Sequence, residues 1–472
     1  MSIASILNIA RSAMFAQQAS IQISSNNIAN VNTKGYCRLD PDLREAPLIP
    51  TDYGLLGNGV EIAGFIRYFD KFLETSIAQR NTDLQEQKTS VTYFERIESI
   101  LNEDSSRLAT NVTEFFNSWQ ELSADPSNLA RRTSLVAKGE NLARTIRNIY
   151  SELNGLQREL DQQVQGEVDE INRLTASIAD LNQKIIELGS ASQGEASDYL
   201  NQRAELLKEL SGKMKVVSFE DQAGGLTVLT ENGRTLVDRT NSWKLRTQQD
   251  HATGFRNIAW EDGAGNLSDI TGAINSGKLK ALLDMRDQHL GNGFIADINN
   301  LAQTIITEVN SRHMEGYGLN DSIGFASTGI SFFTQATSDF ARDMDLSVQV
   351  KTDVRYIAAA SSAEDSSGND NALRIASLID TDLMIGGQST RFSTYISTVM
   401  SNIGDLTKNA QDLSDHQESA MTIMEQQRES RSGVSIDEEL TKLMKYQYAY
   451  QAAARLISVA DEMFQEILQV GR

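Results

Sequence analysis

The first 33 residues, MSIASILNIARSAMFAQQASIQISSNNIANVNT at positions 1–33, contain a single charged side chain, Arg11. Within this stretch every seventh residue is apolar, and these residues are Leu7, Met14, Ile21 and Ile28. A narrow apolar column flanked by uncharged amides and hydroxyls is typical of a helix that packs sideways against other helices. Ser, Gln and Asn are too frequent here for a membrane span, so we expect no insertion into a membrane.

The other end of the chain repeats this pattern. A second column with seven-residue spacing consists of Ile436, Leu443, Tyr450, Ile457 and Phe464. Neither column has an apolar partner close to it in sequence, so the two terminal helices are expected to meet each other. We predict that residues 1–60 plus 430–472 form a terminal coiled-coil domain and that both columns make inter-subunit contacts in a polymer.

Helical periodicity dominates the chain between these ends. Apolar residues at positions 142–188 alternate by three and four, and a four-residue shift between Leu160 and Val164 joins two frames. This pattern predicts one helix of about 50 residues, roughly 75 Å long. With similar patterns before and after it, the sequence predicts a long helical bundle over 61–212 plus 272–429. Within that bundle we expect an irregular region over 316–370, with one strand at 346–350.

The periodicity changes from helical to extended at residue 213. Short β-type runs cover 216–219, 226–229, 235–237, 243–245 and 258–260. Gly-Gly, Asn-Gly and Asp-Gly pairs separate several of these runs, and Asn-Gly between two such runs is a strong hairpin signal. We therefore predict a small β-rich outer domain over 213–271. The expected fold class is mainly α with an inserted antiparallel β domain.

Composition argues against several kinds of partner and chemistry. The 43 Lys and Arg residues are outnumbered by 64 Asp and Glu residues, and the resulting net charge of −21 repels nucleic acid. Cys37 is the only cysteine, which excludes an intramolecular disulfide and a Cys-clustered metal site, so we expect a structural thiol. The four histidines have no metal-ligand spacing. We expect no catalytic residue, no cofactor, no metal and no enzymatic activity.

Two segments at the extreme ends carry a family resemblance. The stretch NNIANVNTKGY at positions 26–36 resembles the signature of bacterial flagellar rod, hook and hook-associated proteins, and residues 433–464 are similar to the C-terminal signature of the same family. The signature residues are Asn26, Asn27, Asn30, Asn32, Gly35, Tyr36, Asp461 and Glu462. The family commonly has Pro where this chain has Lys34 and Ser where it has Cys37.

The middle of the chain distinguishes between members of that family. Residues 125–188 and 277–287 resemble the hook-associated members that form the junction between hook and filament. The resemblance implies a structural subunit needed for filament assembly and motility. The implied partners are other copies of the chain in a ring, the hook protein, a second junction protein on the filament side, and an export chaperone on the C-terminal helix.

The same resemblance implies an extracellular location in the flagellum. Export would use the flagellar type III apparatus, and residues 1–19 lack the basic start and apolar core of a cleaved signal peptide. One alternative is a hook or rod subunit of the same family. Another is a secreted enzyme or adhesin that uses flagellar ends as an export tag, which would require a catalytic or ligand cluster within 213–370.

Overall fold

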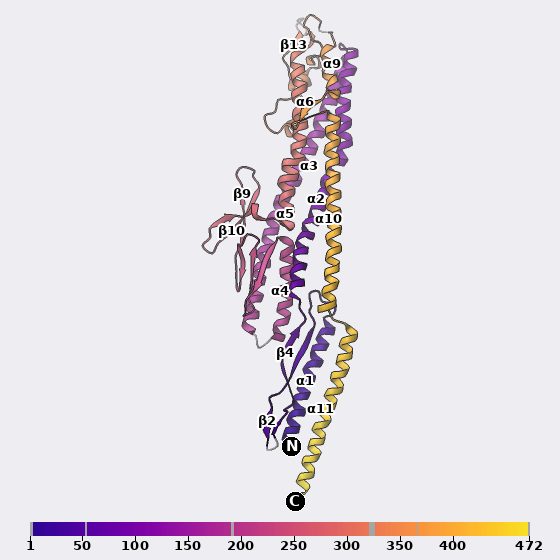
Figure 1. Cartoon of the computed structure of the whole chain (residues 1–472). Helices are drawn as coiled ribbons and strands as arrows, with labels where there is room; N and C mark the ends of the chain where they lie inside the picture. Colours follow the sequence, from indigo (N-terminus) through magenta and orange to yellow (C-terminus); the bar gives the residue numbers. More distant parts are fainter. Residues whose placement is uncertain (1–2, 52–53, 190–192, 321–325, 366, 471–472) are drawn as a thin grey trace.

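The chain forms a long, narrow molecule with both termini at the same end (Figure 1). The computed structural model describes residues 3–51, 54–189, 193–320, 326–365 and 367–470, so the outermost residues of the expected terminal domain, 1–2 and 471–472, lie outside the described residues. Among the described residues, no helix is both long and apolar enough to cross a membrane.

The terminal part pairs the two ends of the chain. Helix α1 (Ile3–Ala29) packs along helix α11 (Ile436–Val470), and the two run in opposite directions (Figure 1). Beside them, β1 (Leu39–Glu45) and β4 (Val60–Arg67) form an antiparallel ribbon. The ribbon ends in a small antiparallel pair, β2 (Ile49–Thr51) and β3 (Gly54–Leu56). Strand β4 therefore crosses the expected boundary between residues 60 and 61.

Long helices build the shaft above this part. These are α2 (Lys71–Ala124), α3 (Leu129–Leu188), α4 (Gln193–Lys213) and α10 (Phe392–Ser432). Helix α3 is a single helix of 60 residues, and Leu160 and Val164 are both fully buried. The shift between the two heptad frames is thus accommodated inside the core. The Asn128 side chain caps the start of α3 by accepting from the N–H groups of Ala130 and Arg131.

The next helical stretch contains a π-helical segment. Helix α5 (Lys278–Asp284) leads into the π-helix η3 (Met285–Ile295), which continues as α6 (Ala296–Glu315). Gly293 departs from helical φ and ψ angles inside this segment.

Two small sheets form the β-rich region against α3. The first contains β5 (Val216–Glu220), β6 (Leu226–Thr230), β7 (Thr235–Asp238) and β8 (Asn241–Ser242) in that order. The second contains β9 (Leu245–Gln249), β10 (Arg256–Glu261) and β11 (Leu267–Asp269), with β10 in the centre. Of the strand expected over 243–245, only Leu245 is extended, as the first residue of β9, because the chain crosses from one sheet to the other at 243–244.

The far end of the shaft is built from short elements. They are β12 (Tyr317–Asn320), β13 (Ala326–Thr328), α7 (Phe340–Asp343), α8 (Val348–Thr352), η4 (Val354–Tyr356), α9 (Asp370–Ala376), η5 (Ser377–Asp380), β14 (Leu383–Ile385) and β15 (Gln388–Thr390). The short helix η2 (Thr271–Ala273) instead connects β11 to α5 and packs against β10. The strand predicted at 346–350 is wrong. Helix α8 begins there because the Ser347 side chain caps it, accepting from the Val350 N–H.

Candidate assembly interface

The seam between α1 and α11 is lined by small and polar side chains. Those of α1 that are buried are Ala10, Ala16, Ser20, Ile23, Ser24 and Asn27. Those of α11 that are buried are Glu439, Ala453 and Ala460. Small side chains allow the two helices to approach closely, and the larger apolar residues are left at the flanks of the seam.

Asn27 stabilises the end of this seam that lies nearest the shaft, through four hydrogen bonds. Its Nδ2 donates to the Leu39 carbonyl oxygen (2.8 Å) and to Oε2 of Glu439 (3.1 Å). Its Oδ1 accepts from the Tyr36 hydroxyl (2.8 Å) and from the Leu39 N–H (3.1 Å). The Glu439 carboxylate also pairs with Lys442 at 3.0 Å, and Lys442 pairs with Asp40 at 2.7 Å. Residues more than 400 positions apart are thereby held in one buried polar network.

Two more signature residues shape the turn after α1. Burial, together with the nearby carboxylates of Asp198 and Glu439, raises the pKa of Tyr36 to about 12, so its hydroxyl stays protonated and can donate to Asn27. Gly35 has a φ of +79°, and a Cβ at this position would lie 2.4 Å from Cγ of Glu205. Any other residue would be strained at this φ and would have to displace the Glu205 side chain, which accounts for the glycine.

Polar contacts gather where the terminal part meets the shaft, some of them within the terminal part and some within the base of the shaft. Arg38 pairs with Glu438 at 3.0 Å, and its N–H donates to the Ser432 carbonyl oxygen at 2.9 Å. Arg428 pairs with Glu74 at 2.7 Å. Because the Arg428 and Glu74 side chains are only 11% and 18% exposed, this pair is shielded from solvent at the joint.

Cys37 lies inside the same joint. It is buried, and the Arg67 guanidinium donates to its Sγ at 3.6 Å. Burial raises the pKa of the Cys37 thiol, although Arg67 and Arg428 act in the opposite direction. This environment fits a structural thiol. Lys34 is exposed on the turn that precedes it.

The remaining signature residues have simpler surroundings. The Asn30 side chain donates to the Asn26 carbonyl oxygen (3.0 Å) and side chain (2.8 Å), which caps the last turn of α1. Asn32 is exposed in the following turn. Asp461 and Glu462 are exposed near the end of α11.

The two apolar columns expected from the sequence lie at the edges of the seam. Leu7, Met14, Ile21, Ile28, Leu443, Tyr450 and Ile457 are all half-buried. Ile436 and Phe464 are exposed, at 47% and 50%. The structure therefore brings most of both columns to the same helix pair, beside its centre.

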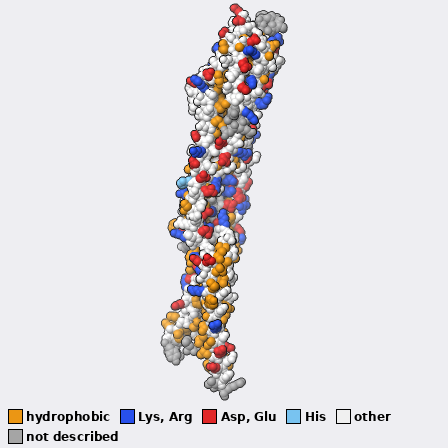
Figure 2. Space-filling view, turned by 90° about the vertical axis from the view of Figure 1, so that its right-hand side faces the viewer, with side chains coloured by type: hydrophobic (Ala, Val, Ile, Leu, Met, Phe, Trp, Pro, Cys, Tyr) orange, Lys and Arg blue, Asp and Glu red, His pale blue; other side chains and the backbone are white. Residues whose placement is uncertain are grey.

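A larger apolar surface on the outer side of α11 escaped the sequence reasoning. Its exposed members are Leu440, Met444, Tyr448, Leu456, Val459 and Met463, and we call them the outer stripe. Figure 2 shows hydrophobic side chains gathered over the lower part of this face, whereas charged side chains cover the shaft. The sequence does contain a signal for this surface, because apolar residues recur every four positions from residue 440. They lie on the helix face next to the column with seven-residue spacing.

Helix α11 also extends beyond the start of α1 (Figure 1). Every residue from 461 to 469 is exposed, including Ile467 at 59% and Leu468 at 57%. Contiguous exposed apolar surface of this kind marks an interaction site. Within the described part of the chain, no group of three or more His, Cys, Asp or Glu residues could hold a metal ion.

The fold and this surface define an elongated, mainly helical protein whose paired terminal helices expose apolar side chains. A family model described as "Flagellar hook-associated protein FlgK helical domain" matches residues 94–333. The chain belongs to this family, whose members are structural proteins of the bacterial flagellum. Models for the flagella basal body rod protein and for the C-terminal part of the basal body rod proteins FlgEFG match residues 7–36 and 425–470.

Named relatives agree over nearly the whole chain. Flagellar hook-associated protein 1 of Bacillus subtilis is 25% identical, with 98% of this chain and 97% of the relative covered. The protein of the same name from Escherichia coli is 25% identical, with 99% and 100% covered. The structure of the flagellar hook junction protein FlgK from Burkholderia pseudomallei has a TM-score of 0.63 and 13% identity, and covers 76% of this chain and all of the other, which supports the fold.

Proposed function

We propose that this chain forms the junction between the hook and the filament of the bacterial flagellum. Full-length similarity to proteins named flagellar hook-associated protein 1 supports this role. The observation that carries the polymerisation mechanism is the outer stripe on α11, an apolar surface that α1 leaves uncovered. Copies of the chain pack side by side through this stripe and through the two columns, and so form a ring.

The charge pattern supports lateral packing of many copies. Helix α1 carries one charged residue, Arg11, whereas the net charge of the chain is −21. The uncharged flanks of α1 let neighbouring copies approach this helix without repulsion, and the shaft holds most of the acidic residues away from the contact.

The remaining partners and the export route are those that the family resemblance implies. The hook protein lies on one side of the ring and a second junction protein on the filament side. Before assembly, an export chaperone covers the exposed apolar residues of α11, and the chain leaves the cell through the flagellar type III apparatus without a cleaved signal. Burial of the stripe on arrival then drives assembly.

Deletion of the gene tests the junction role against the hook or rod alternative. We expect complete hooks without filaments in electron micrographs, and flagellin released into the medium. Cells that lack hooks altogether would contradict the junction role and favour the alternative. Wild-type filaments on the deletion strain would contradict both.

A further inference from the structure

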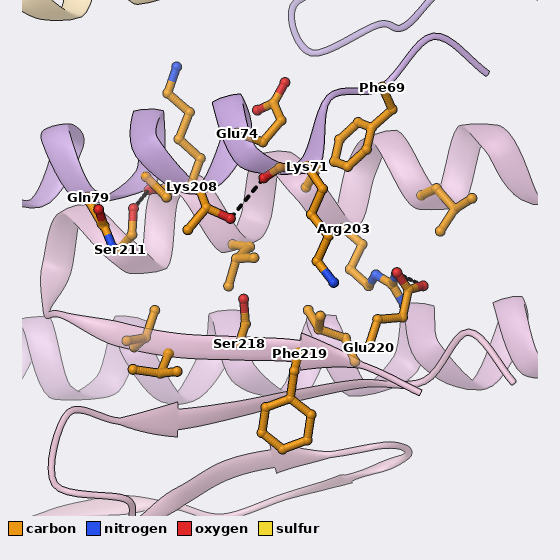
Figure 3. A pocket seen from close by; sticks show the side chains of 18 of the residues that line it. Phe69, Lys71, Glu74, Gln79, Arg203, Lys208, Ser211, Ser218, Phe219 and Glu220 are labelled. Carbon is orange, nitrogen blue, oxygen red and sulfur yellow. Dashed lines mark hydrogen bonds and ion pairs between the residues drawn. The ribbon is translucent and has the colours of Figure 1, made fainter. Parts of the chain in front are cut away.

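A cavity of about 290 Å³ lies between the start of α2, one face of α4 and strand β5 (Figure 3). Its apolar lining includes Phe69, Ala78, Ala204 and Leu207. All five residues of β5 contact it, although successive side chains of a strand point to opposite faces. The cavity must therefore run along the edge of the strand.

Strand β5 offers a free hydrogen-bonding edge to this cavity. It is the first strand of its sheet, and β6 is its only sheet partner within the described ranges of the chain. The Asp221 N–H donates to the Gly225 carbonyl oxygen, and the register pairs Glu220 with Leu226. Hydrogen-bonded and non-hydrogen-bonded residue pairs alternate along an antiparallel ladder, and Asp221 with Gly225 is a hydrogen-bonded pair. The backbone N–H and C=O groups of Val216, Ser218 and Glu220 therefore point away from β6. Among the described residues, no hydrogen bond reaches these outward N–H groups.

The lining is positively charged in an acidic protein. Five cationic side chains line the cavity, against two carboxylates, Glu74 and Glu220. The cations are Arg67, Lys71, Arg203, Lys208 and Lys215. Glu220 is already paired with Arg203 at 2.6 Å, and Glu74 is paired with Arg428 at 2.7 Å outside the lining. The surplus charge is therefore positive.

This surplus is concentrated at one end of the cavity. Arg203, Lys208 and Lys215 each have a carboxylate partner within 2.7 Å. Neither Arg67 nor Lys71 has an ionic partner among the described residues, and Figure 3 shows Lys71 reaching from α2 toward β5. Arg67 donates to Oδ1 of Asn201 (2.7 Å) and to Sγ of Cys37 (3.6 Å), which are uncharged groups, so a carboxylate placed here would balance the charge of two cations that have no ionic partner.

We propose that this groove binds an extended, acidic segment of a partner protein, which adds as a strand to β5. The free backbone edge supplies main-chain hydrogen bonds, the apolar lining takes alternate side chains, and Arg67 and Lys71 hold a carboxylate. The site is separate from the terminal helices, so this partner differs from the neighbouring copies in the ring.

Binding of a fluorescently labelled eight-residue peptide with alternating Val and Glu to the full chain tests the proposal. We expect micromolar affinity by fluorescence anisotropy, and much weaker binding of the matched peptide in which Lys replaces Glu. Ser218→Pro removes one outward N–H but no bond to β6, and should weaken binding about tenfold. Ala204→Trp fills the cavity and should do the same, whereas Ala252→Trp in an exposed turn should not.

A charge reversal tests the acidic preference separately. Lys71→Glu should weaken binding at least about threefold, and Lys244→Glu, at an exposed position between β8 and β9, should leave it unchanged. Thermal unfolding confirms that each variant is folded. Equal binding of both peptides, or unchanged binding to both Ser218→Pro and Ala204→Trp, would overturn the proposal. Self-association of the chain that Ser218→Pro abolishes, without peptide binding, would overturn it in favour of a second copy.

Discussion

At the scale of single residues, the signature of this family has a physical explanation in a few buried contacts. Asn27 is fully buried and satisfies all of its donors and acceptors by joining the turn after α1 to Glu439 of α11. The sequence identified this asparagine only by resemblance. Its role depends on a contact across 412 positions, and local periodicity carries no information about such a contact.

Replacement of Asn27 should loosen the terminal pair. Asn27→Ala removes four hydrogen bonds and leaves the buried Glu439 carboxylate with fewer donors, so we expect a loss of about 2–4 kcal/mol in the local stability of this pair. Hydrogen exchange of residues 27–40 measures the loss. The neighbouring Asn26→Ala, at an exposed position, is the control, and equal exchange in both variants would contradict the network.

His313 makes the stability of the shaft depend on pH. Burial, opposed by a hydrogen bond with the Ile330 carbonyl oxygen, lowers its pKa from 6.5 to about 4. The neutral ring donates from Nδ1 to Ile330 and accepts the Ala358 N–H at Nε2 (3.0 Å). Because the unfolded chain binds this proton more tightly, stability is full above pH 6.5 and falls by about 3 kcal/mol as pH drops to 4.

Denaturant unfolding between pH 4 and 7 measures this effect. His313→Gln should be less stable than wild type at pH 7 but should show a flatter dependence on pH. His416→Gln, at an exposed position of α10, should keep the wild-type slope. An unchanged slope in His313→Gln would contradict the assignment.

At the scale of helices and strands, period and turn chemistry predicted much of what is observed. Helix α3 ends at Leu188, where its periodic pattern ends, and the shift at Leu160 leaves it unbroken. The strand expected at 346–350 failed because a run of alternating apolar residues is too short to separate strand from helix, and the Ser347 cap decided the outcome. The outer stripe was missed because two apolar patterns overlap on α11, and only the packing of α1 shows which one is covered.

The outer stripe gives a variant that separates folding from assembly. Met444 is 52% exposed, so Met444→Asp should leave thermal unfolding of the free chain unchanged. In the ring, a buried and unpaired carboxylate would cost several kcal/mol, and we expect incorporation into flagella to fall at least about tenfold. Immunoblots of purified flagella measure it.

Met384→Asp is the matched control for that experiment. Met384 is 65% exposed and lies on β14 at the far end of the shaft. We expect normal incorporation of this variant into flagella, which would show that an added surface charge alone does not prevent incorporation. Normal incorporation of Met444→Asp as well would contradict packing through the outer stripe.

At the scale of the whole molecule, we propose a division into a terminal pair, a helical shaft and an outer β-rich unit. The shaft and the outer unit share one continuous core that includes residues from Tyr93 to Ala410. The buried residues of the terminal seam are mostly small or polar, so we expect the stability of this pair to depend on neighbours. The order of these parts was predictable, because helical and extended patterns alternate along the chain. The salt bridge between Arg428 of α10 and Glu74 of α2 was not predictable.

The free chain should therefore be ordered unevenly. We expect fast hydrogen exchange in residues 3–29 and 436–470 of the monomer and slow exchange in α3, because an isolated pair with so little apolar seam is marginal in water. In assembled flagella the same terminal residues should become protected. Equal protection of the terminal helices in both states would mean that assembly does not order them.

An electron cryo-microscopy map of the assembled hook–filament region tests the central claim most directly. The account predicts a ring of this chain in which α1 and α11 form the wall, with the outer stripe of each copy packed on its neighbour. A ring held together through the β-rich unit, with the terminal helices facing solvent, would contradict it.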